Sequence, residues 1–262
     1  MLFAKKSLGQ NFLMHAQTAE RIVEAAKLPS SATVLEVGPG TGMLTRALLT
    51  KAGKVIAVEA DDSLARQLLE TFADDVGSGK LVIEHNDIRA FDPTQINGPY
   101  HVVANIPYYI TGEIIRQFLT ATHKPQDMTL LVQKEVAERI ARNGGKESLL
   151  SLSIAAYGVP EYCFTVPRGA FRPAPSVDSA VLAIRNIRHD AFPSLEAENR
   201  FFSVLRAGFA HKRKRLAKNL EVLAPASRIV SAMEVLGVDP NVRPEDVPIH
   251  TWKALAEKLK GP

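Results

Sequence analysis

The chain has 262 residues, of which 46% are hydrophobic and 23% charged, with a formal net charge of +4. This composition predicts a globular protein with a sizeable core, and the basic excess permits a polyanionic partner without requiring one. No run approaches the roughly 18 apolar residues of a membrane span, no signal-peptide core follows the first charges, and the single cysteine, Cys163, excludes an internal disulfide, so we expect a protein of the reducing cytoplasm.

Short apolar runs alternate with amphipathic patterns through the first 188 residues. Runs rich in Val and Ile predict strands at residues 33–37, 54–59, 80–85, 101–105, 128–133, 162–166 and 179–186. Helical patterns lie at residues 42–50, 63–72, 111–122, 134–142 and 149–157. The alternation predicts an α/β fold with seven strands, mostly parallel, between layers of helices. Since no helix separates the last two strands, we expect them to form an antiparallel hairpin at one edge.

The pattern changes after residue 188, where strand-like runs cease. Helices are predicted at residues 195–209, 213–220, 226–236 and 251–260, so residues 189–262 are expected to form a small all-helical domain behind a first domain of residues 1–188. This domain carries a dense cationic run made of Lys212, Arg213, Lys214, Arg215 and Lys218. Such a run favours contact with phosphates. The alternative is a solvated helix face.

A glycine loop follows the first predicted strand. Strand 33–37 runs into Gly38, Gly40 and Gly42 before a helical pattern begins. Glycines at a strand–helix junction permit a sharp turn and let a ligand approach the backbone closely. The spacing G-x-G-x-G differs from the G-x-G-x-x-G of dinucleotide binders, so by itself the loop also fits a simple turn.

Acidic residues end the next two predicted strands. Glu59 lies where a carboxylate in such folds binds ribose hydroxyls, about 20 residues beyond the glycines. Asp87 follows the third strand, where it can accept a hydrogen bond from an adenine amine while Ile88 packs on the ring. Because the ends of parallel strands meet at one edge, these groups are expected to share a crevice. The alternatives are a surface strand end for Glu59 and a turn cap for Asp87.

The expected ligand of this crevice is a nucleoside without phosphates. A P-loop lysine pattern is absent from the sequence, which argues against a nucleoside triphosphate. S-adenosylmethionine fits better. Its carboxylate is expected at the helix start after Gly42, and its sulfonium is expected to tolerate the acidic edge formed by Glu36.

The fourth predicted strand ends in Asn105 and is followed by a turn of Ile106, Pro107 and Tyr108, which suits the modification of an exocyclic amine. The adenine amine is a poor nucleophile because its lone pair is delocalised into the ring. Two acceptors, the Asn105 side-chain oxygen and a backbone carbonyl of the following turn, favour its pyramidal geometry. Pro107 fixes φ and removes a competing donor. Tyr108 can stack on a base flipped out of its polymer, the alternative being a loop-packing aromatic.

Six short motifs are spread over nearly the whole chain. They occupy residues 6–13 (KSLGQNFL), 35–42 (LEVGPGTG), 58–59, 86–87, 105–108 and 171–179 (FRPAPSVDS). Together they resemble the small-subunit ribosomal RNA adenine N6,N6-dimethyltransferase family. The glycine loop is general to methyltransferases, whereas the first and last motifs are specific. The resemblance implies a Rossmann-like class I methyltransferase sheet followed by the helical domain.

The resemblance also implies the residues of the site. An N-terminal segment of residues 1–14 would cover the cofactor, which is then held by Gln10, Asn11, Leu13, Glu36, Gly38, Gly40, Glu59, Asp87, Ile88 and Asn105. The catalytic residues are then Asn105, Ile106, Pro107 and Tyr108. Phe171 is expected to sandwich the target base opposite Tyr108.

The implied substrate is a pair of adjacent adenosines in a hairpin loop near the 3′ end of small-subunit rRNA. Each would be dimethylated at N6 within an immature ribosomal subunit, with the cationic run contacting rRNA phosphates. We further expect a cytoplasmic monomer that needs neither a metal nor a membrane.

Alternative functions remain open on the same scaffold. One is a large-subunit rRNA adenine methyltransferase of the macrolide-resistance type, which shares the Asn-Ile-Pro-Tyr chemistry. Another is a noncatalytic RNA-binding or assembly factor. A DNA amino-methyltransferase is disfavoured because the sequence has no inserted target-recognition domain.

Overall fold

The computed structural model describes residues 10–141 and 145–260. The chain forms two compact units, one of residues 1–141 and 158–189 and the other of residues 142–157 and 190–262. The second unit thus includes α7 (Leu149–Ala155), which the sequence placed in the first domain. The reason lies in Tyr157, whose ring lies 5.6 Å from that of Phe192 and 6.0 Å from that of Phe202 and whose hydroxyl donates to Glu198.

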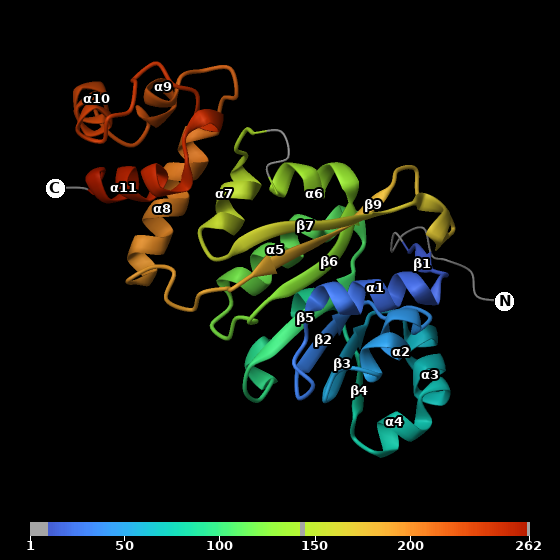
Figure 1. The fold of residues 1–262 in the computed structure, drawn as a ribbon. Coiled ribbons are helices and arrows are strands. Elements are labelled where there is room, and N and C mark those ends of the chain that lie inside the picture. The colour runs from blue at the N-terminus through green and yellow to red at the C-terminus, as the bar shows by residue number, and fades with distance from the viewer. Residues whose placement is uncertain (1–9, 142–144, 261–262) are drawn as a thin grey trace. The chain divides into compact units, whose positions relative to one another are not determined.

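The first unit contains a seven-stranded sheet in the order β4-β3-β2-β5-β6-β9-β7 (Figure 1). Its strands are β2 (Thr33–Val37), β3 (Lys54–Glu59), β4 (Leu81–His85), β5 (Tyr100–Asn105), β6 (Met128–Gln133), β7 (Val159–Val166) and β9 (Ser179–Arg185). Strands β2 to β6 pair in parallel, whereas β9 is antiparallel to both β6 and β7. The predicted α/β fold with an antiparallel hairpin at one edge is therefore confirmed. The strand order reverses between β2 and β5, which in open α/β sheets places the binding crevice at their carboxyl ends.

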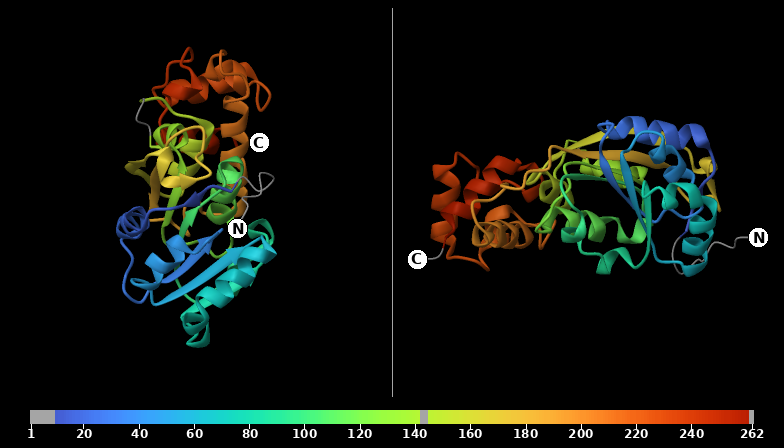
Figure 2. Two further views of the ribbon diagram at one scale, coloured as in Figure 1. Left: turned by 90° about the vertical axis from the view of Figure 1, so that its right-hand side faces the viewer. Right: turned by 90° about the horizontal axis from the view of Figure 1, so that it is seen from below.

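Helices lie on both faces of this sheet, as Figure 2 shows for α1 and α5. The helices of the first unit are α1 (Ala16–Ala26), α2 (Met43–Leu49), α3 (Asp62–Thr71), α4 (Ala73–Gly77), α5 (Thr111–Thr120) and α6 (Lys134–Ile140). Helices α1 and α2 bury Ile22 and Leu48 in one core cluster with Val34 and Val103 of the sheet. The sequence did not predict α1. Among the described residues its first turn has no side-chain cap, so the usual start signal is missing.

A separate two-stranded sheet fixes the N-terminal segment to the first unit. Strand β1 (Phe12–Leu13) pairs antiparallel with β8 (Phe171–Arg172), so that Phe12 faces Arg172 and Leu13 faces Phe171 in the register. The Leu13 and Phe171 side chains are both buried in the core cluster. Two of the specific sequence motifs, far apart in the chain, therefore meet here.

The second unit is helical and packs around Trp252. Besides α7 it contains α8 (Leu195–Gly208), α9 (Leu216–Leu220), α10 (Ala226–Val235) and α11 (Ile249–Lys258). The buried Trp252 indole donates to the Val247 carbonyl at 3.0 Å and lies so close to Gly208 that a Cβ there would be 2.3 Å from the ring. Across both units, none of the helices in the described residues has the length and apolar character needed to cross a membrane.

Candidate active site

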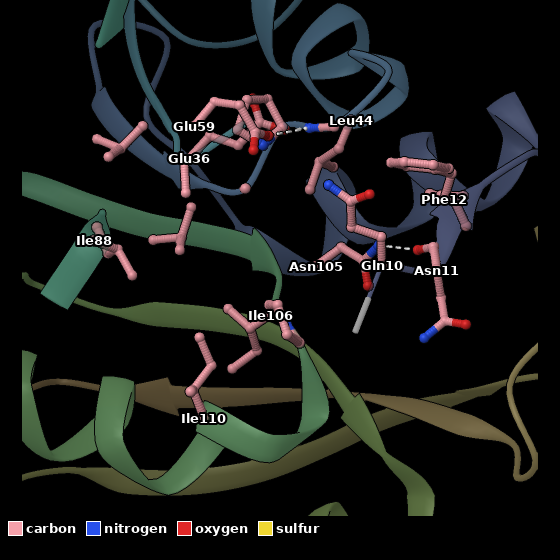
Figure 3. Close-up of a pocket in the computed structure, with 18 of the residues that line it drawn as sticks. Gln10, Asn11, Phe12, Glu36, Leu44, Glu59, Ile88, Asn105, Ile106 and Ile110 are labelled. Carbon is pink, nitrogen blue, oxygen red and sulfur yellow. Dashed lines mark hydrogen bonds between the residues drawn. The ribbon is translucent and has the colours of Figure 1, made fainter. Parts of the chain in front are cut away.

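A pocket opens at the carboxyl ends of β2, β3, β4 and β5 in the first unit (Figure 3). Every residue that the sequence predicted to hold the cofactor lines it: Gln10, Asn11, Leu13, Glu36, Gly38, Gly40, Glu59, Asp87, Ile88 and Asn105. The three remaining residues of the predicted catalytic turn, Ile106, Pro107 and Tyr108, line it as well. The empty volume, which includes solvent at the mouth, is about 1040 Å³.

The glycine loop after β2 leaves room for a ligand against its backbone. Gly38 and Gly40 have φ values of +65° and +59°, a region that side chains rarely adopt. A Cβ on Gly38 would meet no described atom within 4 Å, although Gly38 lines the pocket. A Cβ on Gly40 would instead approach the Phe12 ring to 3.0 Å. Phe12 of β1 therefore covers the loop at Gly40, whereas the backbone at Gly38 stays accessible to a ligand.

Glu59 at the end of β3 fastens the glycine loop to the neighbouring strand. Its Oε2 accepts from the Gly40 backbone N–H at 3.0 Å, and its Oε1 accepts from the Asp61 N–H at 2.9 Å. Burial raises the pKa of Glu59 despite these two hydrogen bonds. Each carboxylate oxygen can accept more than one hydrogen bond, so the site retains acceptor capacity for hydroxyl groups.

Glu36 is the most deeply buried acid of the pocket. It is 1% exposed, and both its carboxylate oxygens lack a hydrogen-bond partner among the described residues. Burial raises its pKa to about 8; the nearby Thr45 hydroxyl opposes this rise and the Glu59 carboxylate adds to it. Figure 3 shows the Glu36 and Glu59 side chains close together. A buried acid without partners favours a cationic ligand, which would stabilise its ionised form.

Asp87 after β4 is held by a side chain that the sequence did not point to. Both Asp87 oxygens accept from the Arg89 guanidinium, at 2.5–3.1 Å, and Oδ1 also accepts from the Arg89 backbone N–H at 3.0 Å. The Arg89 side chain lowers the pKa of Asp87. On α5, the Gln117 amide donates to the Ile88 carbonyl at 2.7 Å, which fixes this turn at the pocket wall.

Asn105 at the end of β5 presents its side-chain oxygen to the pocket. Its Nδ2 donates to the Asn11 backbone carbonyl at 3.0 Å, shown dashed in Figure 3. Its Oδ1 accepts no hydrogen bond from the described residues. The N-terminal segment thus orients the amide so that an acceptor remains for a ligand. Residues 1–9 of the predicted covering segment lie outside the described residues.

The two tyrosines after Asn105 are held differently. The Tyr108 hydroxyl lies 2.6 Å from the Ser179 hydroxyl, and burial raises the pKa of Tyr108. Tyr109 also lines the pocket, yet its side chain is 63% exposed. Ser179 belongs to the motif at residues 171–179 but was not predicted as a site residue. This contact gives that motif a role in fixing Tyr108.

Phe171, which was predicted to sandwich the target base opposite Tyr108, belongs to the buried core cluster. It is 4% exposed and packs in the core with Leu13, and it is not among the described residues that line the pocket. The physical reason is the pairing of β8 with β1, which buries Phe171 beneath the N-terminal segment. The predicted sandwich of the target base therefore gains no support from this geometry.

The cationic run of the second unit lies on a turn and not on the predicted helix. Helix α9 starts only at Leu216, so Lys212 to Arg215 precede it. The turn is fixed by Asn219, whose Nδ2 donates to the Gly208 carbonyl at 2.5 Å and to the His211 carbonyl at 3.1 Å. The alternative interpretation, a solvated helix face, is therefore wrong for residues 212–215, because they precede the helix. Lys218 is on α9 and pairs with Glu221 at 2.5 Å.

The donor set suits an S-adenosyl cofactor. The bare Gly38 backbone leaves space that a Cβ would fill, and the buried Glu36 carboxylate has no partner among the described residues. The Glu59 carboxylate oxygens can accept hydrogen bonds from hydroxyl groups of a ligand. Within residues 10–141 and 145–260, no group of three or more His, Cys, Asp or Glu side chains is placed to hold a metal ion.

Comparison with known families gives a match over nearly the whole chain. A family model described as "Ribosomal RNA adenine dimethylase" matches residues 1–260. The chain is 43% identical to Ribosomal RNA small subunit methyltransferase A of Dehalococcoides mccartyi, covering 99% of this chain and 90% of that protein. It is 36% identical to the protein of the same name from Streptococcus pneumoniae, covering 98% and 92%.

Solved structures share the same fold. The crystal structure of the 23S rRNA methyltransferase ErmE matches with a TM-score of 0.77 at 30% identity, over 95% of this chain and 99% of that one. A dimethyladenosine transferase from Plasmodium falciparum matches with a TM-score of 0.79 at 24% identity, over 93% and 95%. The second likeness concerns the fold alone.

Proposed function

This chain belongs to the ribosomal RNA adenine dimethylase family, and from that premise we propose that it methylates N6 of two adjacent adenosines in a hairpin loop near the 3′ end of small-subunit rRNA. The product is N6,N6-dimethyladenosine. The particle is an immature small subunit, and the enzyme acts as a cytoplasmic monomer. The observation that carries the proposal is the Asn105 side-chain oxygen, which receives no donor from residues 10–141 and 145–260 and lies at the edge of the pocket where the cofactor residues converge.

The family resemblance seen in the sequence is confirmed by the near-full-length matches. The protein is therefore an rRNA adenine dimethyltransferase, and S-adenosylmethionine is its methyl donor. When bound, this cofactor supplies an electrophilic methyl group on a sulfonium. We assign Gly38 to its backbone contact, Glu59 to its ribose hydroxyls, and Asp87 with Ile88 to its adenine. Glu36 lies where an ionised carboxylate favours the cationic centre.

The chain's own residues prepare the attacking amine. Asn105 Oδ1 and a backbone carbonyl of the Ile106–Pro107 turn accept from the two N–H groups of the target adenine. These contacts favour a pyramidal nitrogen, and they strengthen as positive charge develops on it in the transition state. The amide nitrogen of Asn105 stays on Asn11, so the acceptor is already aimed before the base arrives. No general base is required, because the methylated ammonium can release its proton to water.

Tyr108 holds the flipped base by stacking. Its hydroxyl contact with Ser179 fixes the ring before the base arrives, which reduces the entropy lost on binding. Stacking of a base on an aromatic side chain contributes on the order of 1–3 kcal/mol. The cationic turn of the second unit supplies sequence-independent attraction to rRNA phosphates. Its four side chains, Lys212 to Arg215, are exposed.

The proposal is tested by incubating the protein with undermethylated small subunits and methyl-labelled S-adenosylmethionine, followed by nucleoside analysis of the rRNA. We expect dimethyladenosine from the wild type and none from Asn105→Ala. Large subunits serve as the parallel substrate. Label on large-subunit rRNA with none on the small subunit would contradict the substrate and favour the macrolide-resistance type of activity. Methylation elsewhere than adenine N6 would contradict the chemistry.

A further inference from the structure

Tyr109 is an exposed aromatic ring on the rim of the pocket. It directly follows Tyr108, lines the same pocket, and is 63% exposed. Tyr108 has a hydroxyl partner, whereas the Tyr109 hydroxyl makes no hydrogen bond with the described residues. An aromatic ring that served only to pack the loop would be expected to bury its face. The exposed ring is therefore available to a ligand at the rim of the pocket.

We propose that Tyr109, together with Arg89, forms a second nucleotide subsite that holds the nucleotide flanking the target adenosine. The base of that nucleotide stacks on the Tyr109 ring, and Arg89 contacts its phosphate. The inference rests on the proposed function, because it requires a target base in the pocket beside Asn105 and Tyr108. It adds a specificity element that the catalytic turn itself does not contain.

Chain continuity brings the flanking nucleotide to this place. The Cα atoms of Tyr108 and Tyr109 are separated by one trans peptide, about 3.8 Å. A base held at Tyr108 stays covalently joined to its neighbour, which must lie at the mouth of the pocket. The ring at that mouth is Tyr109. Stacking there tolerates any base, because every base offers a π-face. The subsite can therefore hold an unmodified or an already methylated neighbour while the two target adenosines are treated in turn.

Arg89 supplies a positive charge at the same rim. Its side chain is 53% exposed and lines the pocket, and its electrostatic neighbours include Glu113 and Tyr109. The guanidinium uses Nε and Nη2 to bind Asp87, while Nη1 donates to no acceptor among the described residues. Asp87 thus holds the guanidinium in place and leaves one edge available for a phosphate oxygen. A planar guanidinium is well suited to that contact.

The test compares steady-state kinetics of Tyr109→Ala and Tyr109→Phe with undermethylated small subunits as substrate. For Tyr109→Ala we expect KM for the particle to rise about tenfold, with the dissociation constant of S-adenosylmethionine and the thermal midpoint unchanged. Tyr109→Phe keeps the ring and should keep the wild-type KM. Leu69→Ala, which truncates an exposed side chain on α3 outside the pocket, is the matched control. A wild-type KM in Tyr109→Ala would overturn the stacking subsite, as would a tenfold loss in Tyr109→Phe.

A second variant tests the phosphate contact. Arg89→Gln should raise KM and make its dependence on salt shallower by about 0.7 in the slope of log KM against log salt. An unchanged slope would overturn the role of Arg89. Because Arg89 also binds Asp87, the cofactor dissociation constant is measured separately, and a rise in it alone would count against the phosphate contact. Absence of methylation by the wild type would refute the proposed function, whereas intact wild-type activity with unchanged Tyr109→Ala kinetics refutes the subsite alone.

Discussion

The pocket and the cationic turn hold charged side chains in opposite ways. In the pocket, Glu36 and Glu59 are buried and burial raises the pKa of both. In the turn, Lys212 to Arg215 are exposed to solvent, and Asn219 fixes the preceding backbone at the His211 carbonyl. Buried acids act through their position, so each one matters greatly. Exposed charges act additively and are screened by salt. Chemistry is therefore expected to depend on single pocket residues, and rRNA attraction on the sum of the turn.

The largest effect on cofactor affinity is expected for Glu59→Ala. This change removes the acceptor for the ribose hydroxyls and leaves the Gly40 N–H without its partner. The loss of two hydrogen bonds to a charged group, at about 1.5 kcal/mol each, corresponds to a roughly 100-fold larger dissociation constant of the cofactor. Calorimetric titration with S-adenosylmethionine measures it. Glu70→Ala, an exposed acid on α3, is the control. A dissociation constant equal to that of the control would show that the pocket does not depend on this buried acid.

Asn219→Ala is expected to lower the free energy of unfolding and to leave the cofactor affinity unchanged. The Gly208 and His211 carbonyls then lose a buried donor, which costs about 1–3 kcal/mol in the free energy of unfolding. Asn241→Ala, whose side chain bonds only within an exposed turn, should change the unfolding free energy far less. Denaturant unfolding and cofactor titration are measured on the same samples. Weakened cofactor binding in Asn219→Ala would show that the pocket depends on the cationic turn, contrary to the expectation that the two regions act independently.

Glu36 makes cofactor affinity depend on pH. Its pKa is raised from 4.5 to about 8, so near neutral pH the free protein keeps a proton there. A cationic ligand favours the ionised form, so binding releases that proton and affinity rises with pH up to about 8. The expected rise is up to about tenfold per pH unit between pH 6 and 8. The demethylated cofactor, with its neutral sulfur, should show a weaker dependence, and Glu36→Gln should show none from this group. Titration calorimetry in buffers of different ionisation enthalpy counts the released proton.

The same shift affects stability with the opposite sign. Between pH 4.5 and 8 the unfolded chain loses the Glu36 proton while the folded protein retains it. The free energy of unfolding of the wild type should therefore fall relative to Glu36→Gln as pH rises through this range. Denaturant titrations at several pH values measure the difference. A difference that stays constant with pH would show that Glu36 is not protonated in the folded protein.

The smallest effect is expected for single charges of the cationic turn. Arg213→Ala should weaken binding to small subunits only a few-fold and reduce the magnitude of the negative slope of log affinity against log salt by about 0.7–0.9. Lys218→Ala is the matched control, because Lys218 is already paired with Glu221. It should change the slope less. A loss of 100-fold from Arg213→Ala alone would show that the turn recognises its target through one specific contact.

Much of the sheet and of the pocket could be predicted because the local pattern and the tertiary role coincide. Strands buried on both faces are dense in Val and Ile, so most of their limits were predicted to within one residue. Strand β7 was predicted to begin three residues late, and a register irregularity between Tyr162 and Phe164 interrupts its alternation. The pocket residues lie at strand ends, which parallel topology brings together.

The remaining features depend on contacts that local sequence patterns do not encode. Arg89 binds Asp87 through a side-chain conformation that no motif encodes. Phe171 is turned into the core by the pairing of β8 with β1. Helix α9 starts at Leu216, later than predicted, where the Leu216 N–H donates to the Val242 carbonyl at 2.9 Å. For Phe171 and for α9 the deciding contact joins segments that are distant in the sequence.

The central claim is that the Asn105 oxygen acts as an acceptor for the attacking amine. An unmethylated adenine offers two N–H groups to the two acceptors, whereas a monomethylated adenine offers one. Single-turnover rates of the wild type and Asn105→Ala on small subunits carrying unmethylated or monomethylated target adenosines test this directly. We expect Asn105→Ala to slow the first transfer by about 10²–10³ and the second transfer by clearly less. Equal losses in both transfers would contradict the account.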